Sequence, residues 1–379
     1  MADKNKTGLL LLGGGARAAY QVGVLKALAQ SLPRNHGIPF PILSGTSAGA
    51  INATALSCYA SCFHLGVKKL EWVWKNFQTD MVYKSNFKTL YRNLLKNLSP
   101  LKDENISVKS DSWFDNSPLQ ILLEQLLDLD RIQSNIDRQY LKAICVTASS
   151  YHSGDSVCLY QSGDEIKPWV RAKRRGIHSP IKIEHLMASS AIPMVFPSVE
   201  LHGEYFGDGS INQLSPLSAP IHLGAEKIFI IGMDQPKNRF FYHEDKALPP
   251  AGGAIVGHLL DTIFSEVLTS DIERMQRINQ TLNFIKPEYR EKSGLKNIQT
   301  LQINPSKSFS EIAAKHYASM PFSIRSLLRI LGINANTAHK SSLISYLLFE
   351  QNYCRELIQL GLEDGLAKID EIKSFLQID

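Results

Sequence analysis

The residues of this chain best suited to chemistry are a serine between two glycines and a glycine triplet about thirty positions before it. The serine is Ser47 in Gly45-Thr46-Ser47-Ala48-Gly49, between the apolar run 41–44 and an uncharged segment of helical character. Such a strand–turn–helix setting presents a serine hydroxyl on a tight turn. Side chains at Gly45 or Gly49 would collide with the neighbouring backbone there. The pattern therefore predicts that Ser47 is the nucleophile of an acyl-transfer reaction.

The glycine triplet is suited to the other half of that chemistry. Gly13, Gly14, Gly15, Ala16 and Arg17 directly follow a run of four leucines that we expect to form a strand. Consecutive backbone N–H groups at a strand end and helix start can bind the negative charge that develops on a carbonyl oxygen. We therefore predict that this loop forms an oxyanion hole.

Two later motifs complete a pattern. Ser189-Ser190-Ala191-Ile192-Pro193 stands shortly before Phe206-Gly207-Asp208-Gly209. With the glycine triplet and the serine elbow, and in this order, these motifs resemble the signature of the patatin-like phospholipase family. Residues 343–349 also resemble C-terminal stretches of bacterial members, so the resemblance covers nearly the whole chain.

The chain departs from the family pattern at three positions. Ala18 stands where many members have glycine, Ser210 replaces the usual Gly or Ala, and Leu214 falls where asparagine is common. None of the three is the nucleophile or the base. They therefore bear on substrate preference more than on activity.

The resemblance implies a three-layer α/β/α fold with a mostly parallel central sheet. It also implies hydrolysis of phospholipids or lysophospholipids by a Ser–Asp dyad, without a catalytic histidine or a cofactor. Carried onto this sequence, Ser47 forms the acyl-enzyme intermediate and Asp208 is the general base. The backbone of 13–17 forms the oxyanion hole, and Arg17 either steadies that loop or meets a phosphate.

Elementary chemistry supports an aspartate in this role. A serine hydroxyl needs a neighbour that accepts its proton, and a free aspartate, with a pKa of about 3.9, is a weak base. Burial beside apolar groups such as Phe206 would raise the pKa of Asp208 and strengthen it as a base. Gly207 and Gly209 permit a tight turn. The structural alternative is that Asp208-Gly209 is an ordinary hairpin turn.

Several functional alternatives remain open. The same dyad would serve a broad carboxylesterase, a thioesterase or an acyltransferase. A triad would need one of the later histidines of the chain, which are His222, His243, His258, His316 and His339. The stretch Gly13-x-Gly15-x-x-Ala18 formally fits a dinucleotide-binding turn. However, no acidic residue lies between Asp3 and Glu71, which leaves only an NADP-binding version centred on Arg34.

Composition is that of an ordinary globular protein, with 44% hydrophobic and 20% charged residues in 379. The five scattered cysteines favour reduced thiols, and no cluster of metal ligands appears. The leucine run is too short for a signal peptide, and no apolar stretch is long enough to span a membrane. These observations predict a cytoplasmic protein that can associate with a membrane surface. No motif for nucleic acid appears.

Positive charge is uneven along the chain. Residues 1–70 carry seven Lys or Arg against one acid, whereas the net charge of the whole chain is +5. A second basic run contains Arg171, Lys173, Arg174 and Arg175, two positions after Trp169. The run is either a solvated face or a surface that docks on anionic membrane, with Trp169 as an interfacial anchor.

Short apolar runs alternate with helical patterns, which favours an α/β fold with a largely parallel sheet. We expect strands at 8–12, 42–45, 141–148, 157–161, 195–201, 227–233 and 301–303. We expect helices at 20–31, 48–63, 70–77, 118–129, 183–190 and about 253–282, and another opened by the capping box 308–311. The predicted organisation is a catalytic core at 8–233, a linker or loop at 234–252, and a mainly helical C-terminal extension at 253–379 packed on the core. The stretch 80–112 is expected to be a loop.

Overall fold

A mixed, mostly parallel β-sheet forms the centre of the computed structural model, which describes residues 6–84, 112–236, 252–262, 267–335 and 337–378. The strands are β1 (Thr7–Leu11), β2 (Ile42–Thr46), β3 (Ala143–Ser150), β4 (Ser156–Ser162), β5 (Trp169–Arg171), β6 (Arg174–His178), β7 (Val199–Leu201), β8 (Glu204–Asp208), β9 (Lys227–Ile231) and β10 (Gln299–Ile303). Their order is β10-β9-β1-β2-β3-β4-β6-β5, and β8 pairs with both β3 and β7. The five strands from β10 to β3 are mutually parallel.

The register of the central strands brings three loops to one edge of the sheet. Leu11 at the end of β1 is paired with Gly45 in β2, and Thr46 at the end of β2 is paired with Thr147 in β3. The antiparallel strand β8 ends opposite β3, where Asp208 is paired with Ala148. Parallel strands end at the same edge of a sheet, and the register of β8 puts its last residue beside the end of β3. The segments that follow β1, β2 and β8 therefore all begin at this edge.

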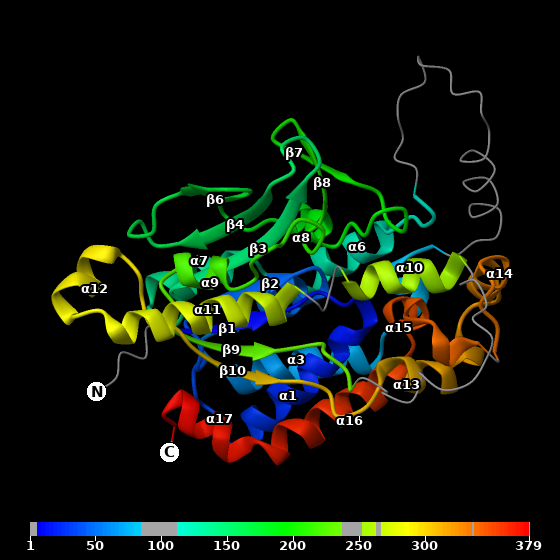
Figure 1. Cartoon of the computed structure of the whole chain (residues 1–379). Helices are drawn as coiled ribbons and strands as arrows, with labels where there is room; N and C mark the ends of the chain where they lie inside the picture. Colours follow the sequence, from blue (N-terminus) through cyan, green and yellow to red (C-terminus); the bar gives the residue numbers. More distant parts are fainter. Residues whose placement is uncertain (1–5, 85–111, 237–251, 263–266, 336, 379) are drawn as a thin grey trace.

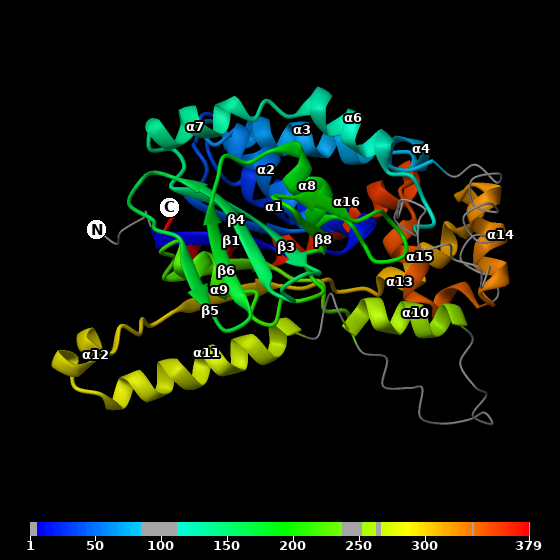
Figure 2. The same cartoon turned by 90° about the horizontal axis from the view of Figure 1, so that it is seen from above.

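Helices lie on both sides of this sheet (Figure 1, Figure 2). They are η2 (Gly15–Ala18), α1 (Ala19–Gln30), α2 (Ala48–Cys58), α3 (Phe63–Lys75), α4 (Thr79–Val82), α6 (Ser117–Leu126), α7 (Asp130–Asp137), α8 (Ile183–Ser189), α9 (Ser218–His222), α10 (Gly252–Asp261), α11 (Val267–Phe284), α12 (Pro287–Ser293), α13 (Phe309–Lys315), η5 (Tyr317–Ser319), α14 (Phe322–Ile330), η6 (Ala338–Lys340), α15 (Ser342–Leu347), α16 (Gln351–Ala367) and α17 (Ile369–Leu376). Figure 2 shows α2, α3, α6 and α7 on one side and α9 and α11 on the other. The predicted mixed α/β fold with a mostly parallel central sheet is confirmed.

The uncharged segment after the serine forms a buried helix, as its composition predicts. Every residue of α2 except Ile51 is buried, and the helix packs on β2 and β3. It ends at Cys58, earlier than expected. The side-chain amide of Asn135, in α7, donates to the carbonyls of Ser57 and Cys58 at 2.8 and 3.3 Å. These bonds satisfy carbonyl groups that the end of the helix leaves open.

The segment after 252 is closely joined to the rest of the molecule. Its strand β10 pairs in parallel with β9 at the sheet edge, and α16 lies along α1 (Figure 1). The two helices touch through glycines, because a Cβ at Gly23 would fall on the carbonyl oxygen of Ile358. A Cβ at Gly361 would likewise fall on the carbonyl oxygen of Tyr20. Ser308 caps the start of α13, with its Oγ accepting from the N–H of Glu311 at 3.4 Å, which is one of the two bonds of the expected capping box.

Several expectations need correction. The strands β5, β6 and β8 were not expected, and the helix expected at 253–282 is described as α10 and α11, on either side of 263–266. Cys145 and Cys158 form a disulfide between β3 and β4, so the expectation of reduced thiols is wrong for this pair. Most of the loop expected at 80–112 and of the linker expected at 234–252 lies outside the described residues. Among the residues that the structure describes, no helix combines the length and apolarity needed to cross a membrane.

The contact between α1 and α16 gives a test of the fold. Gly23→Ala should lower the free energy of unfolding by about 1–3 kcal/mol, because its methyl group must displace the backbone of α16. Urea denaturation would measure this. The matched control is Gly37→Ala, whose methyl group would lie 3.4 Å from the nearest atom, the carbonyl oxygen of Ala60. Equal stability of both variants would contradict the proposed close packing.

Candidate active site

The turn between β2 and α2 has the geometry of a nucleophile elbow. Ser47 has φ 55° and ψ −132°, a conformation that side chains rarely adopt. A Cβ at Gly49 would fall on the carbonyl oxygens at the end of the leucine run, and a Cβ at Gly45 would meet the backbone of Ala50 at 2.5 Å. Both glycines therefore let the first turn of α2 approach the sheet closely enough to force this turn at Ser47.

A second serine, Ser189, binds the backbone of Ser47. The backbone N–H of Ser47 donates to Ser189 Oγ at 2.8 Å, and Ser189 Oγ donates to the carbonyl of Thr147 at 2.6 Å. Ser189 is the last residue of α8 and is fully buried. It thus links the elbow to β3. Ser189 lies in one of the sequence motifs, but no role could be predicted for it. Its contacts with Ser47 and Thr147 form only once β2 and β3 are paired.

Asp208 lies at the same edge, at the end of β8. Its backbone N–H donates to the carbonyl of Ala191 at 2.8 Å, and Oδ1 accepts from the N–H of Ser210 at 2.9 Å. Oδ2 is buried and has no hydrogen-bond partner among the described residues. Burial raises the pKa of Asp208 to about 6, and the nearby hydroxyl of Ser47 and the N–H of Ser210 oppose this increase. The carboxyl group is thus a stronger base than a free aspartate and has an oxygen available for a proton.

The glycine loop approaches Ser47 from β1. Gly15 has φ 54°, and a Cβ there would fall on the carbonyl oxygen of Tyr346, so only glycine fits. In η2, the N–H groups of Gly15 and Ala16 have no acceptor within the helix, whereas the N–H of Arg17 is bonded to the carbonyl of Gly14 at 3.1 Å. Gly15 and Ser47 line the same pocket. The N–H groups of Gly15 and Ala16 can therefore serve as hydrogen-bond donors beside Ser47.

The side chain of Arg17 leads from this loop into the C-terminal helices. It is fully buried, and its guanidinium carbon lies 3.7 Å from the centre of the Tyr346 ring. Nε donates to Ser345 Oγ at 2.8 Å, and Nη1 donates to Asp261 Oδ1 at 3.0 Å. Asp261 also accepts from the hydroxyl groups of Tyr346 and Ser342. These contacts are those of a residue that holds the loop in place.

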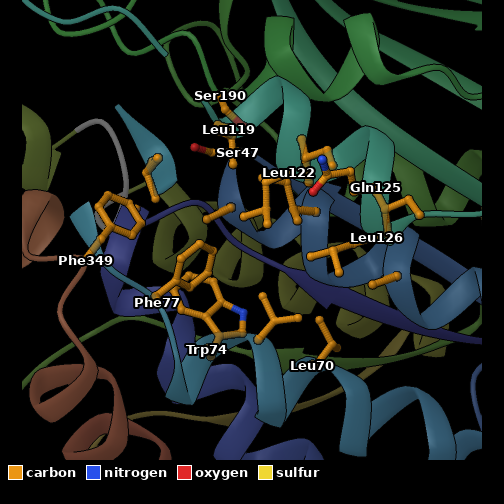
Figure 3. Close-up of a pocket in the computed structure, with 18 of the residues that line it drawn as sticks. Ser47, Leu70, Trp74, Phe77, Leu119, Leu122, Gln125, Leu126, Ser190 and Phe349 are labelled. Atoms are coloured by element: carbon orange, nitrogen blue, oxygen red, sulfur yellow. The ribbon is translucent and has the colours of Figure 1, made fainter. Parts of the chain in front are cut away.

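A largely apolar pocket of about 170 Å³ begins at Ser47 (Figure 3). Its walls come from α2, α3 and α6, which sequence analysis did not bring together. Near Ser47 the lining residues Phe77, Leu119 and Phe349 are buried. At the other end, between α3 and α6, the lining residues Lys69, Gln125 and Leu126 are exposed. Among the described residues, the pocket therefore reaches the surface between these two helices.

The basic run lies on the hairpin of β5 and β6. Trp169 is half-buried, and its ring stacks on Tyr160 and on His222, with 4.9 Å between centroids in each case. Arg175 Nη2 bonds both carboxylate oxygens of Glu204, at 2.6 and 2.9 Å. Trp169 and Arg175 thus both pack against or bind other side chains of the fold. The run's exposed side chains are Arg171 and Lys173, while Arg174 is half-buried.

Other candidate groups lie away from the serine. No histidine among the described residues lines the pocket or bonds Asp208. His185 is buried in α8, and burial lowers its pKa to about 4. In the part of the chain that the structure describes, no three His, Cys, Asp or Glu side chains are grouped so as to hold a metal ion. The residues gathered at the sheet edge fit acyl transfer by serine.

Comparison with known proteins gives one family. The model of the family "Patatin-like phospholipase" matches residues 9–221, which is more than half of the chain. No curated protein matches the chain. Among solved structures, VipD from Legionella pneumophila is similar at 14% sequence identity, over 93% of this chain and 67% of that chain, with a TM-score of 0.36.

The raised pKa of Asp208 predicts how activity and stability depend on pH. If Asp208 is the base, kcat/KM should rise with pH through about 6 and then level off, since only the carboxylate accepts a proton. Asp208→Asn should remove this activity. The folded pKa exceeds the unfolded value, so the stabilising contribution of Asp208 is lost as pH rises from about 4 to about 6.

The same substitution should therefore stabilise the fold above pH 6, by up to roughly 2–3 kcal/mol, because it removes a buried charge. Urea denaturation of both proteins at acidic and alkaline pH would measure the difference. An inactive variant that is also less stable at alkaline pH would contradict the assigned cause of the pKa shift.

Proposed function

The chain belongs to the patatin-like phospholipase family, and on that premise we propose that it hydrolyses phospholipid or lysophospholipid esters with a Ser47–Asp208 dyad. Family membership supports lipid acyl hydrolysis. The dyad, the oxyanion hole and the choice of a glycerophospholipid are our proposal.

The reaction proceeds in two halves. Asp208 takes the proton of Ser47 Oγ, which attacks the ester carbonyl carbon, and the N–H groups of the glycine loop bind the resulting oxyanion. The tetrahedral intermediate collapses to acyl-Ser47, and the alcohol leaves with the proton from Asp208. A water molecule then attacks the acyl group while Asp208 takes its proton. Collapse of the second intermediate returns that proton to Ser47 and releases the fatty acid.

The observation that carries the proposal is the apolar pocket that starts at the nucleophile. Ile51, Ala55 and Tyr59 line it at steps of four residues along and just beyond α2. Twelve residues at the helical rise correspond to about 18 Å between Ser47 and Tyr59. One leaflet of a bilayer has a hydrocarbon thickness of about 15 Å. This row of side chains is therefore long enough to lie along an extended acyl chain, with its ester at Ser47.

The same dyad would also support a carboxylesterase, a thioesterase or an acyltransferase. These activities differ in the leaving group or in the acceptor of the acyl chain, and not in the nucleophile. Mass spectrometry of the products from mixed-lipid vesicles separates them. Free fatty acid and lysolipid support the proposal, whereas inert phospholipids with rapid thioester cleavage would contradict it.

The nucleophile can be tested directly. A fluorophosphonate should label the protein at Ser47, and Ser47→Ala should remove both labelling and hydrolysis, because Ser47 Oγ is the atom proposed to form the acyl-enzyme. Ser134→Ala, at an exposed position in α7, is the control and should retain both. Undiminished labelling of Ser47→Ala would refute the assignment.

The pocket can be tested by blocking it partway along α2. Ala55→Phe should lower kcat/KM for a palmitoyl ester about tenfold or more, because its ring would fill the path of a long chain. A butyryl ester ends before this position, so its hydrolysis should change little and serves as the control for folding. A parallel loss on both esters would show that the acyl chain does not follow α2.

A further inference from the structure

Ser190 carries a hydroxyl group that the fold does not use. The residue directly follows α8, is 6% exposed, and lines the pocket together with Ser47. Its backbone N–H donates to the carbonyls of Leu186 and Met187 at 3.0 and 3.2 Å. Its Oγ, by contrast, is buried and has no hydrogen-bond partner among the described residues. Figure 3 shows Ser190 beside Ser47 at one end of the pocket.

An unpaired hydroxyl in an apolar pocket destabilises the protein, because folding removes its bonds to water and supplies none in return. Alanine would fill the same space without this penalty. The neighbouring Ser189 shows the contrast, since its Oγ makes two hydrogen bonds that hold the elbow. The two adjacent serines therefore differ: the hydroxyl of Ser189 is bonded at the elbow, whereas that of Ser190, a residue lining the pocket, has no partner in the described chain.

The chemistry of an ester matches this hydroxyl. A serine hydroxyl has one proton to donate, and an ester offers only acceptor oxygens. In the proposed reaction the carbonyl oxygen turns toward the N–H groups of the glycine loop. The alkoxy oxygen is the acceptor that remains, and negative charge develops on it as its bond to the acyl carbon breaks.

We propose that Ser190 Oγ donates a hydrogen bond to the alkoxy oxygen of the scissile ester and so stabilises the departing alcohol. This inference rests on the proposed function. Ser190 keeps its own proton throughout, and the alcohol takes its proton from Asp208. Ser190 is then a catalytic residue in contact with substrate, with no covalent role.

A comparison of two leaving groups tests the inference. An alkyl ester has a poor leaving group and needs this stabilisation, whereas a nitrophenyl ester with the same acyl chain does not. Ser190→Ala should therefore lower kcat for the alkyl ester about tenfold or more and should lower kcat for the nitrophenyl ester much less. Its urea midpoint should equal or exceed that of the wild type, because an unsatisfied hydroxyl is removed.

The matched control is Ser44→Ala in β2. Ser44 Oγ is also buried without a hydrogen-bond partner in the described chain, but Ser44 does not line the pocket. This variant should show the same change in urea midpoint and normal activity on both esters. Selective loss with the alkyl ester in Ser190→Ala alone supports the inference.

Equal losses on both esters, no loss on the alkyl ester, or a lowered urea midpoint in Ser190→Ala would overturn the inference. The proposed function is judged separately, on the wild type. If the wild type hydrolyses both esters, hydrolysis stands whatever Ser190→Ala does. If the wild type cleaves neither ester, the proposed function fails, and the role of Ser190 fails with it.

Discussion

The rest of this site depends on the hydrogen bonds that the buried guanidinium group of Arg17 makes with the C-terminal helices. A charge without solvent must be paired and hydrogen-bonded, and Arg17 finds its partners on α10 and α15, at Asp261 and Ser345. The glycine loop that begins at the end of β1 is therefore held by residues more than two hundred positions later. The family model ends at residue 221, so these partners lie outside the matched segment. The matched segment alone does not contain every residue that holds its glycine loop in place.

The remaining parts of the site converge through the sheet. Parallel pairing of β1, β2 and β3 places the glycine loop and Ser47 at one edge, and β8 brings Asp208 to the same edge from the opposite direction. Hydrogen bonds through Ser189 then tie the elbow to β3. Each functional group thus stands at the end of a strand, where the backbone is fixed by pairing and the next residue is free to turn. Steric demand at the elbow sets the conformation of Ser47.

The sequence predicts the parts of this structure that follow local rules. Apolar runs predict the central strands, and the motif glycines predict tight turns. The structure supplies the reason for these glycines, because the backbone of another segment lies too close to leave room for a side chain. Contacts between segments that are far apart in the chain could not be predicted from the sequence. The last carbonyls of α2 accept hydrogen bonds from Asn135, and nothing in the sequence near Cys58 indicates this contact. Strand β5 has only three residues and β6 begins with two arginines, so neither shows an apolar run in the sequence. The pocket is lined by residues of α2, α3 and α6, which are far apart in the sequence. The lack of a hydrogen-bond partner for Ser190 Oγ in the described chain likewise follows only from the folded structure.

The span between Arg17 and its partners has a consequence for the time course of synthesis. Chains emerge from the ribosome from the N-terminus, at about 5–20 residues per second. The serine elbow and the glycine loop are made early, whereas Ser345 and Tyr346 are made more than three hundred residues after Arg17. Until then the guanidinium group lacks its enclosure, and the loop beside Ser47 lacks its support. A nascent chain therefore carries Ser47 long before it can complete the surroundings of that residue.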